Sequence, residues 1–143
     1  MRDKIIRIQW SEPMLVDEII DSEESDCPGL YYITRKLHGK ETSLYIGKAT
    51  RTIRERLMDH RRKWLSNRYG DKYVRAGIII YPQNVDSEMI DHAESALIFE
   101  HGDLLLDNTD KTKTYSYSEV YQIQNVGNIG ELKPVIRMHN HPD

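Results

Sequence analysis

Residues 29–60 constrain the fold of this chain more than any other stretch. Two β-rich runs, 30–34 and 43–47, are separated by a short loop that contains Gly39. This arrangement predicts an antiparallel hairpin. The run of residues 53–67 follows with helical periodicity, so the hairpin leads directly into a helix. We therefore expect a mixed α/β domain of the α+β kind.

The rest of the chain predicts further elements within one domain that spans residues 1–143. No linker, repeat or low-complexity segment divides the sequence, and 143 residues suit a single hydrophobic core. The additional strands that we expect cover 4–10, 73–81, 115–126 and 132–138. The additional helices begin near Ser11–Pro13, with apolar residues from Met14 to Ile20, and at Asp86, the latter ending at His101 before Gly102.

Composition narrows the class of protein. No segment is apolar for long enough to span a bilayer, and the N-terminus lacks the apolar run of a secretory signal. The single cysteine, Cys27, has no partner for an intramolecular disulfide and no cysteine neighbours for a metal site. We expect a cytoplasmic protein that does not associate with membranes.

Charge is distributed unevenly along the chain. The net charge is −3, but residues 48–75 contain ten Lys and Arg against three acids, a local charge of +7. The remaining ten basic and twenty acidic residues give −10. Such segregation predicts a basic surface on an acidic body, which is suited to a phosphate backbone. A solvated helix rich in Lys and Arg is the plainer alternative.

The helix expected over 53–67 carries two polar residues close to its apolar side. Thr52 and Glu55 have the spacing of a capping box and start the helix at Ile53. At about 100° per residue, His60 falls inside the apolar stripe that ends at Trp64, and Arg56 lies at its edge. We interpret Trp64 as a core residue. His60 taken alone is best explained as a buried structural histidine. Arg56 favours a functional site, because its guanidinium group beside the core keeps its charge and requires a partner.

The helix expected over 86–101 carries an acid on its apolar side. Glu94 lies among residues that face the core, and a carboxylate there costs several kcal/mol, roughly, unless it is paired or bound to a metal. Two interpretations remain open. Glu94 forms a structural ion pair with Arg56 or Lys48, or it ligates a hard divalent cation.

Several of these residues together resemble the signature of the GIY-YIG endonucleases. The matching pattern is Gly29-Leu30-Tyr31, then Tyr45-Ile46-Gly47, then Arg56 and His60 on the following helix. The resemblance implies a small three-stranded antiparallel sheet flanked by helices over residues 29–108. Residues 1–28 and 109–143 would then be terminal elaborations that add a strand and helix and further strands.

The resemblance also assigns roles to residues. It implies that Tyr31, Tyr45, Arg56 and His60 are catalytic, that Lys48 binds phosphate and that Glu94 binds the metal. Gly29 and Gly47 would allow neighbouring backbone segments to approach closely. Asn108 would match a family asparagine by spacing alone. Two departures stand out. The first triplet has Leu30 in place of isoleucine, and Arg56 comes one residue later after Gly47 than the family pattern, so Arg54 and Arg51 remain alternatives to it.

The function implied is metal-dependent hydrolysis of phosphodiester bonds in nucleic acid, with DNA bound through residues 48–75 and one Mg²⁺ or Mn²⁺ ion as cofactor. Tyr31 would take a proton from the attacking water with help from His60 or Tyr45. Because the free pKa of tyrosine is about 10, a neighbour must displace the phenol proton, and His60 or water around the metal could do so. The alternatives are a catalytically inactive nucleic-acid-binding module and a structural domain. We assign no metal to His139 and His141.

Overall fold

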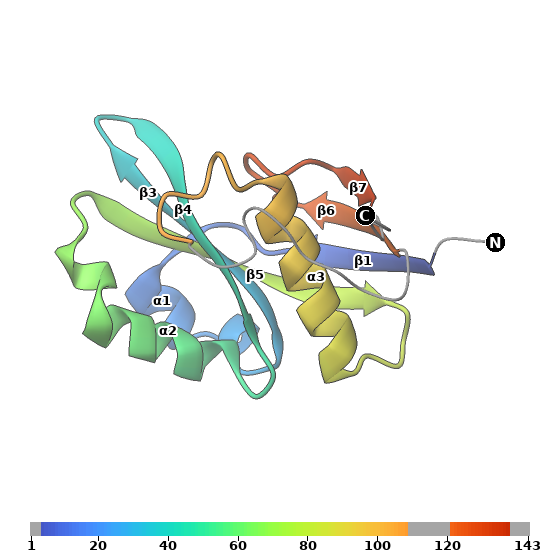
Figure 1. Cartoon of the computed structure of the whole chain (residues 1–143). Helices are drawn as coiled ribbons and strands as arrows, with labels where there is room; N and C mark the ends of the chain where they lie inside the picture. Colours follow the sequence, from blue (N-terminus) through green and yellow to red (C-terminus); the bar gives the residue numbers. More distant parts are fainter. Residues whose placement is uncertain (1–3, 109–120, 138–143) are drawn as a thin grey trace.

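The computed structural model describes residues 4–108 and 121–137, which form one curled sheet with helices on both sides (Figure 1). The strands are β1 (Lys4–Trp10), β2 (Met14–Leu15), β3 (Gly29–Leu37), β4 (Lys40–Ala49), β5 (Asp71–Tyr81), β6 (Tyr121–Gly127) and β7 (Val135–Arg137). The helices are α1 (Val16–Ile20), α2 (Ile53–Lys63) and α3 (Ser87–Glu100), with 3-10 turns η1 (Glu23–Ser25) and η2 (Leu65–Asn67). The α+β class is confirmed.

The sheet is larger than the sequence predicted. Its strand order is β4-β3-β5-β1-β6-β7, with β2 pairing on β5. The three antiparallel strands β4, β3 and β5 are present, but they do not form a separate small sheet. Because β5 is paired with β3 along one edge only, its other edge is open to β1 and β2. β1 then pairs in parallel with β6, which extends the sheet.

The region after β1 differs from the expected helix. Met14 and Leu15 pair with Val74 and Tyr73 of β5, so α1 begins only at Val16. β1 reaches no further along β5 than Gly77. The backbone hydrogen bonds that β5 offers beyond that point outweigh the local preference of Met14 and Leu15 for a helix.

The last strand begins later than expected, whereas β6 covers the described part of its predicted range and ends at Gly127. β6 contains the part of 115–126 from Tyr121 onward, and residues 109–120 lie outside the described residues. β7 starts at Val135 because Pro134 has no N–H to donate to a strand partner. His139 and His141 also lie outside the described residues.

Side chains alternate between the two faces of β3 and build two cores. Tyr31 and Ile33 pack with α1 and α2, whereas Leu30 and Tyr32 pack on the side of α3. Figure 1 shows α1 and α2 together on one side of the sheet and α3 on the other. None of the helices in 4–108 and 121–137 is long and apolar enough to cross a membrane.

The α3 side of the sheet encloses a network of charged and hydroxyl groups. Arg75, which is 3 % exposed, donates to Glu41 and to Asn128. Ser43 donates to Glu131 at 2.6 Å and shares a hydrogen bond with the Tyr32 hydroxyl. Burial raises the pKa of the Glu41 carboxyl, but hydrogen bonds from Arg75 and Thr34 outweigh that effect and leave it lowered. The network therefore joins the β3–β4 hairpin to the segment that follows β6.

Candidate active site

The register of the β3–β4 hairpin brings the two site tyrosines together. Tyr31 lies opposite Gly47, and Ile33 lies opposite Tyr45. The two tyrosines are thus diagonal neighbours on one face of the hairpin. Their rings stack with centroids 6.1 Å apart and planes 25° apart. Tyr31 has no exposed surface, whereas Tyr45 is half-buried.

Both triplet glycines are required by close contacts. A Cβ on Gly47 would lie 2.8 Å from Cε1 of Tyr31 and closer still to Cζ and the phenol oxygen. A Cβ on Gly29 would lie 2.6 Å from the Gly77 carbonyl oxygen of the neighbouring strand. Gly47 therefore provides the space for the Tyr31 ring, and Gly29 allows β3 to approach β5.

Helix α2 presents His60 to these tyrosines. Thr52 caps the helix by accepting from the Glu55 backbone N–H, as the sequence predicted. Ile53 and Leu57 are fully buried on the face that packs against the sheet, and His60 lies on the same face with 8 % of its surface exposed. Its Nε2 is 2.7 Å from the Tyr31 hydroxyl. The predicted burial of His60 is confirmed, and its side chain contacts a site tyrosine.

Trp64 completes an aromatic cluster at the end of α2. Its indole Nε1 donates to Nδ1 of His60 at 2.8 Å. The Tyr45 ring packs against both His60, at 4.9 Å between centroids, and Trp64, at 5.8 Å. The helix stops at Lys63 rather than continuing to Asn67, because Trp64 adopts a non-helical backbone conformation. Trp64 packs on the α2 core but also lines a hollow, so its interpretation as a core residue was incomplete.

Burial is the main cause of the shifted pKa values of His60 and Tyr31. It lowers the pKa of His60 to about 4, with a further contribution from the positive charge of Arg56. The pKa of Tyr31 is raised well above its usual value, mainly by burial and by the neighbouring Tyr45. Arg56 opposes that increase through its charge and a hydrogen bond. His60 is therefore neutral at pH 7, and Arg56 is the group that favours the Tyr31 phenolate.

Arg56 lies where the tyrosines and the solvent meet. Its side chain is 48 % exposed and pairs with Asp59 at 3.9 Å. Burial opposes its charged form, but the phenols of Tyr31 and Tyr45 raise its pKa overall. Arg54 instead donates to the backbone carbonyls of Ile20 and Ser22, away from the tyrosines. Of the three arginines considered, only Arg56 interacts with both phenols.

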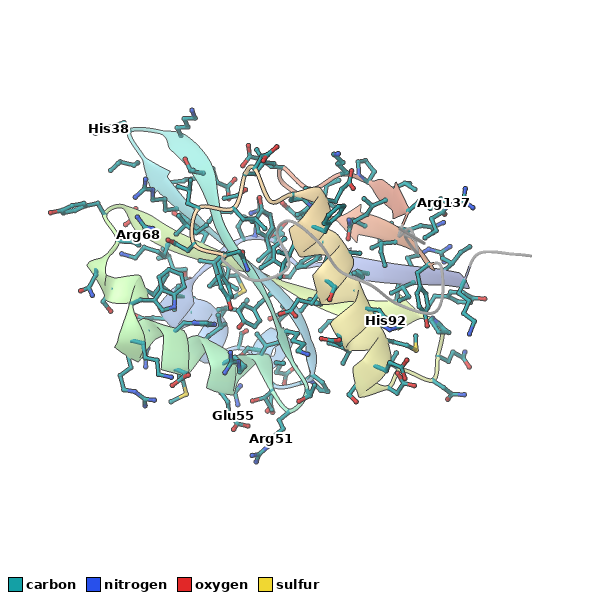
Figure 2. All side chains as sticks on the ribbon, in the orientation of Figure 1. His38, Arg51, Glu55, Arg68, His92 and Arg137 are labelled. Carbon is teal, nitrogen blue, oxygen red and sulfur yellow. The ribbon has the colours of Figure 1, made fainter. Side chains whose placement is uncertain are left out.

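Two adjoining hollows meet at Tyr45 and Arg56. The Glu94 hollow, of about 550 Å³, is bounded by Glu94, Lys48 and Arg51 in addition to those two residues. The Trp64 hollow, of about 640 Å³, includes His60, Trp64, Lys63 and Arg68. Figure 2 shows Arg51 and Arg68 at opposite ends of α2, so the two hollows together follow the length of this helix.

Glu94 reaches its hollow from α3, across the hairpin from α2. Asp86 caps α3 by accepting from the Met89 N–H, and Glu94 is half-buried two turns later. Its negative charge contributes to the raised pKa of Tyr31, so the two groups are close enough to interact. Lys48 forms an ion pair with Asp91, one turn before Glu94 on the same helix. The sequence did not suggest that partner for Lys48.

The Glu94 hollow fits a hydrated divalent cation rather than a closed metal site. Within residues 4–108 and 121–137, no group of three or more His, Cys, Asp or Glu side chains converges as a ligand set. Mg²⁺ keeps several water ligands and commonly binds through one or two carboxylates and substrate phosphates. One half-buried carboxylate in a hollow with room for water and phosphate satisfies that requirement.

Asn108 has a structural position in the described residues. Its Oδ1 accepts from the Ile46 N–H at 2.9 Å, and its Nδ2 donates to the Ile46 carbonyl at 3.0 Å. The Asp107 N–H donates to the Leu44 carbonyl nearby. Asn108 therefore satisfies the outer edge of β4 beside Tyr45, and it does not line either hollow.

One cation of the basic run over residues 48–75 lies away from the surface and from the two hollows. Arg75 is buried on the α3 side and cannot contact a ligand at the hollows. Seven other cations of the run pair with carboxylates: Lys48 with Asp91, Arg54 with Asp26, Arg61 with Asp17, Arg68 with Asp107, and Arg56, Arg62 and Lys63 with Asp59. The expectation of a single basic surface is therefore wrong for Arg75, and for the other cations of the run it stays a prediction. The cations at the hollows are Lys48, Arg51, Arg56, Lys63 and Arg68.

The comparisons with known proteins give no assignment. No family model matches this chain, and no curated protein or solved structure matches it. The resemblance to GIY-YIG endonucleases stays a prediction that is carried by the residues themselves. The sequence did not predict the hydrogen bond from Trp64 to His60. Their spacing of four residues within the same apolar stripe is a signal that could have revealed this contact.

Proposed function

We propose that this protein is a metal-dependent endonuclease that hydrolyses phosphodiester bonds in nucleic acid, with DNA as its substrate. The observation that carries the proposal is the convergence of Tyr45, Arg56, His60 and Glu94, with Tyr31 behind them, on two adjoining hollows. These residues come from β3, β4, α2 and α3. Structural ion pairing alone does not require phenols, an imidazole, a guanidinium and a carboxylate around one accessible space.

The cations at the hollows suit a bent or extended phosphate backbone. Arg56 belongs to both hollows, so a phosphate there would meet a guanidinium donor whichever hollow holds the flanking nucleotides. Lys48 lies in the Glu94 hollow and would neutralise a second phosphoryl oxygen. Arg51 and Arg68, at the two ends of α2, would contact phosphates on either side.

The two phenols have different access to substrate. Tyr45 lines both hollows, so it is the phenol that would meet the attacking water. Tyr31 lies behind it with no exposed surface, which argues against direct contact between Tyr31 and that water. Arg56 interacts with both phenols and favours their ionised form. A phenolate at this position would accept a proton from the water as its oxygen attacks phosphorus.

Glu94, together with water molecules, would hold a single Mg²⁺ or Mn²⁺ ion, whose charge would stabilise the leaving oxygen. Arg56 and Lys48 would stabilise the negative charge on the non-bridging oxygens. A cytoplasmic location belongs to the same proposal, supported by the single unpaired Cys27.

A nicking assay on supercoiled plasmid DNA with and without Mg²⁺ tests the proposal. We expect Arg56→Ala and Glu94→Gln each to reduce the nicking rate by roughly a hundredfold or more, since each removes a charge from the reacting centre. Arg62→Ala and Glu88→Gln are matched controls, because they lie on the same two helices with side chains 74 % exposed. Both controls should retain activity.

Two outcomes would count against the proposal. Full nicking activity in both Arg56→Ala and Glu94→Gln would reject the site. A wild-type protein that binds DNA but does not cut it with Mg²⁺ or Mn²⁺ would favour the inactive binding module.

A further inference from the structure

We propose that Trp64 is a positioning residue that fixes the tautomer of His60, so that His60 donates its Nε2–H to the Tyr31 oxygen. The contribution of this arrangement to cleavage rests on the proposed function. The direction of the hydrogen bond does not, because it can be measured in the protein without substrate.

The argument begins with the chemistry of the indole group. Tryptophan Nε1 carries a hydrogen and is only a donor. Trp64 Nε1 lies 2.8 Å from Nδ1 of His60, so Nδ1 must offer a lone pair. A neutral imidazole carries one proton, which then resides on Nε2. Burial keeps His60 neutral at pH 7, so a second proton on the ring is not available.

The tautomer determines what Tyr31 receives. Nε2 of His60 is 2.7 Å from the Tyr31 hydroxyl oxygen, and with a proton on Nε2 that oxygen is the acceptor. The same oxygen also interacts by hydrogen bonding with Arg56, which has only donors to offer. Tyr31 oxygen therefore faces two donors. This pattern corrects the expectation that His60 displaces the phenol proton, since Nε2 has no lone pair to accept it.

The pattern has a chemical use in the proposed reaction. Two donors on the Tyr31 oxygen would hold the ring that stacks on Tyr45, the phenol that faces the attacking water, and the neutral imidazole does so without adding a positive charge to the buried cluster. With the opposite tautomer, Nε2 would accept the Tyr31 proton and would remove one of the two donors. Trp64 thus acts on Tyr31 through His60 and touches neither water nor phosphate in this role.

Local structure holds Trp64 in place. Trp64 terminates α2, and its backbone N–H donates to the His60 carbonyl at 3.0 Å. Its side chain then turns back over the histidine ring, with ring centroids 5.5 Å apart and planes at 75°. Packing of Tyr45 against both rings restricts rotation of either one.

Nitrogen-15 NMR of the imidazole group tests the tautomer directly. In the wild type at pH 7, long-range proton–nitrogen correlations should show Nε2 of His60 protonated and Nδ1 unprotonated. Trp64→Phe keeps a ring but removes the donor, and His60 should then show the other tautomer or an average of the two. Trp10→Phe is the control, because it removes an indole N–H that donates to Asn125 at 2.9 Å on the α3 side. That variant should leave His60 unchanged.

A protonated Nδ1 in the wild type, or an unchanged tautomer in Trp64→Phe, would overturn the inference. Replacement of Trp64 by 3-benzothienylalanine, in which sulfur takes the place of the N–H, keeps the shape of the indole ring. This second variant gives the same test if Trp64→Phe does not fold.

Cleavage kinetics test the consequence. In plasmid nicking, loss of the Trp64 donor should lower kcat by roughly tenfold, as for other outer partners that orient a site histidine, with KM for DNA unchanged. A rise in KM at constant kcat would show that Trp64 binds DNA instead, and would overturn its positioning role. A wild type that does not cut DNA would reject the proposed function alone, because the NMR result decides the tautomer independently.

Discussion

Gly47→Ala provides a direct test of how the tyrosine hairpin is packed. The added Cβ would lie 2.8 Å from Cε1 of Tyr31 and closer to Cζ and the oxygen, whereas carbon atoms in ordinary contact are about 3.5–4.0 Å apart. The Tyr31 ring would have to move by about 1 Å. Such a shift would stretch its 2.7 Å hydrogen bond with His60 beyond useful length.

The expected loss of stability combines two effects. Overpacking of a core costs about 1–3 kcal/mol, and loss of a neutral hydrogen bond adds about 1 kcal/mol. The free energy of unfolding should therefore fall by about 2–4 kcal/mol. Urea denaturation would register this as a lower midpoint, shifted by about 1–2 M at a slope of about 2 kcal/mol per M. A change below about 0.5 kcal/mol, the range of ordinary surface substitutions, would refute the packing of Tyr31 on Gly47.

Gly77→Ala separates stability from the site. Its Cβ would lie 2.6 Å from Cζ3 of Trp10, which gives a comparable clash on the α3 side of the sheet. Both variants should lose stability, but only Gly47→Ala should alter the NMR signals of His60. Equal changes at His60 in both would show that the imidazole signals report general loosening instead of the Tyr31 contact.

Two further predictions concern Asn108 and His60. Asn108→Ala should lower the free energy of unfolding by about 1–3 kcal/mol, because the backbone N–H and carbonyl of Ile46 both lose their hydrogen-bond partner. Asn84 is exposed, so Asn84→Ala should have no effect in the same urea titration. The pKa of His60 is about 4 in the folded protein and about 6.5 in the unfolded chain, so the unfolded chain binds more protons between these two pH values. The free energy of unfolding should therefore fall by up to about 3 kcal/mol as the pH drops from 7 to 4. Burial also lowers the pKa of His101, so some pH dependence of stability should remain when His60 is replaced. Urea titrations at both pH values should show a smaller pH dependence in His60→Asn than in the wild type. An equal dependence in both proteins would contradict the neutral buried state of His60.

Local signals in the sequence predicted the elements that carry the candidate site. The hairpin loop at Gly39, the Thr52 cap and the start of α3 after Asp86 are all determined within a few residues, and all three are observed. The extent of the sheet could not be predicted in the same way. Pairing of β1 with β6 joins residues more than a hundred positions apart, and Met14 and Leu15 become a strand only because β5 offers them an open edge.

The convergence of the site residues was predicted by resemblance, but their contacts were not. Helical periodicity placed His60 on the buried side of α2 and Arg56 at its edge, as observed. The ion pair between Lys48 and Asp91 depends on how α3 crosses the hairpin, which no local pattern reveals. Arg75 was counted with the basic surface because its charge is visible in the sequence, whereas its side of β5 depends on the register with β3.

The helix that carries Glu94, α3, packs against strands that lie outside residues 29–108. Its inner face shares a core with Ile6 and Ile8 of β1 and with Tyr121, Ile123 and Ile136 of β6 and β7. Arg75 of β5 donates to Asn128, and Ser43 of β4 donates to Glu131. A chain cut back to residues 29–108 would lose these supports and expose their apolar and ionic partners to water. Residues 4–10 and 121–137 thus support the helix that carries Glu94, and α1 supports the α2 side of the same candidate site.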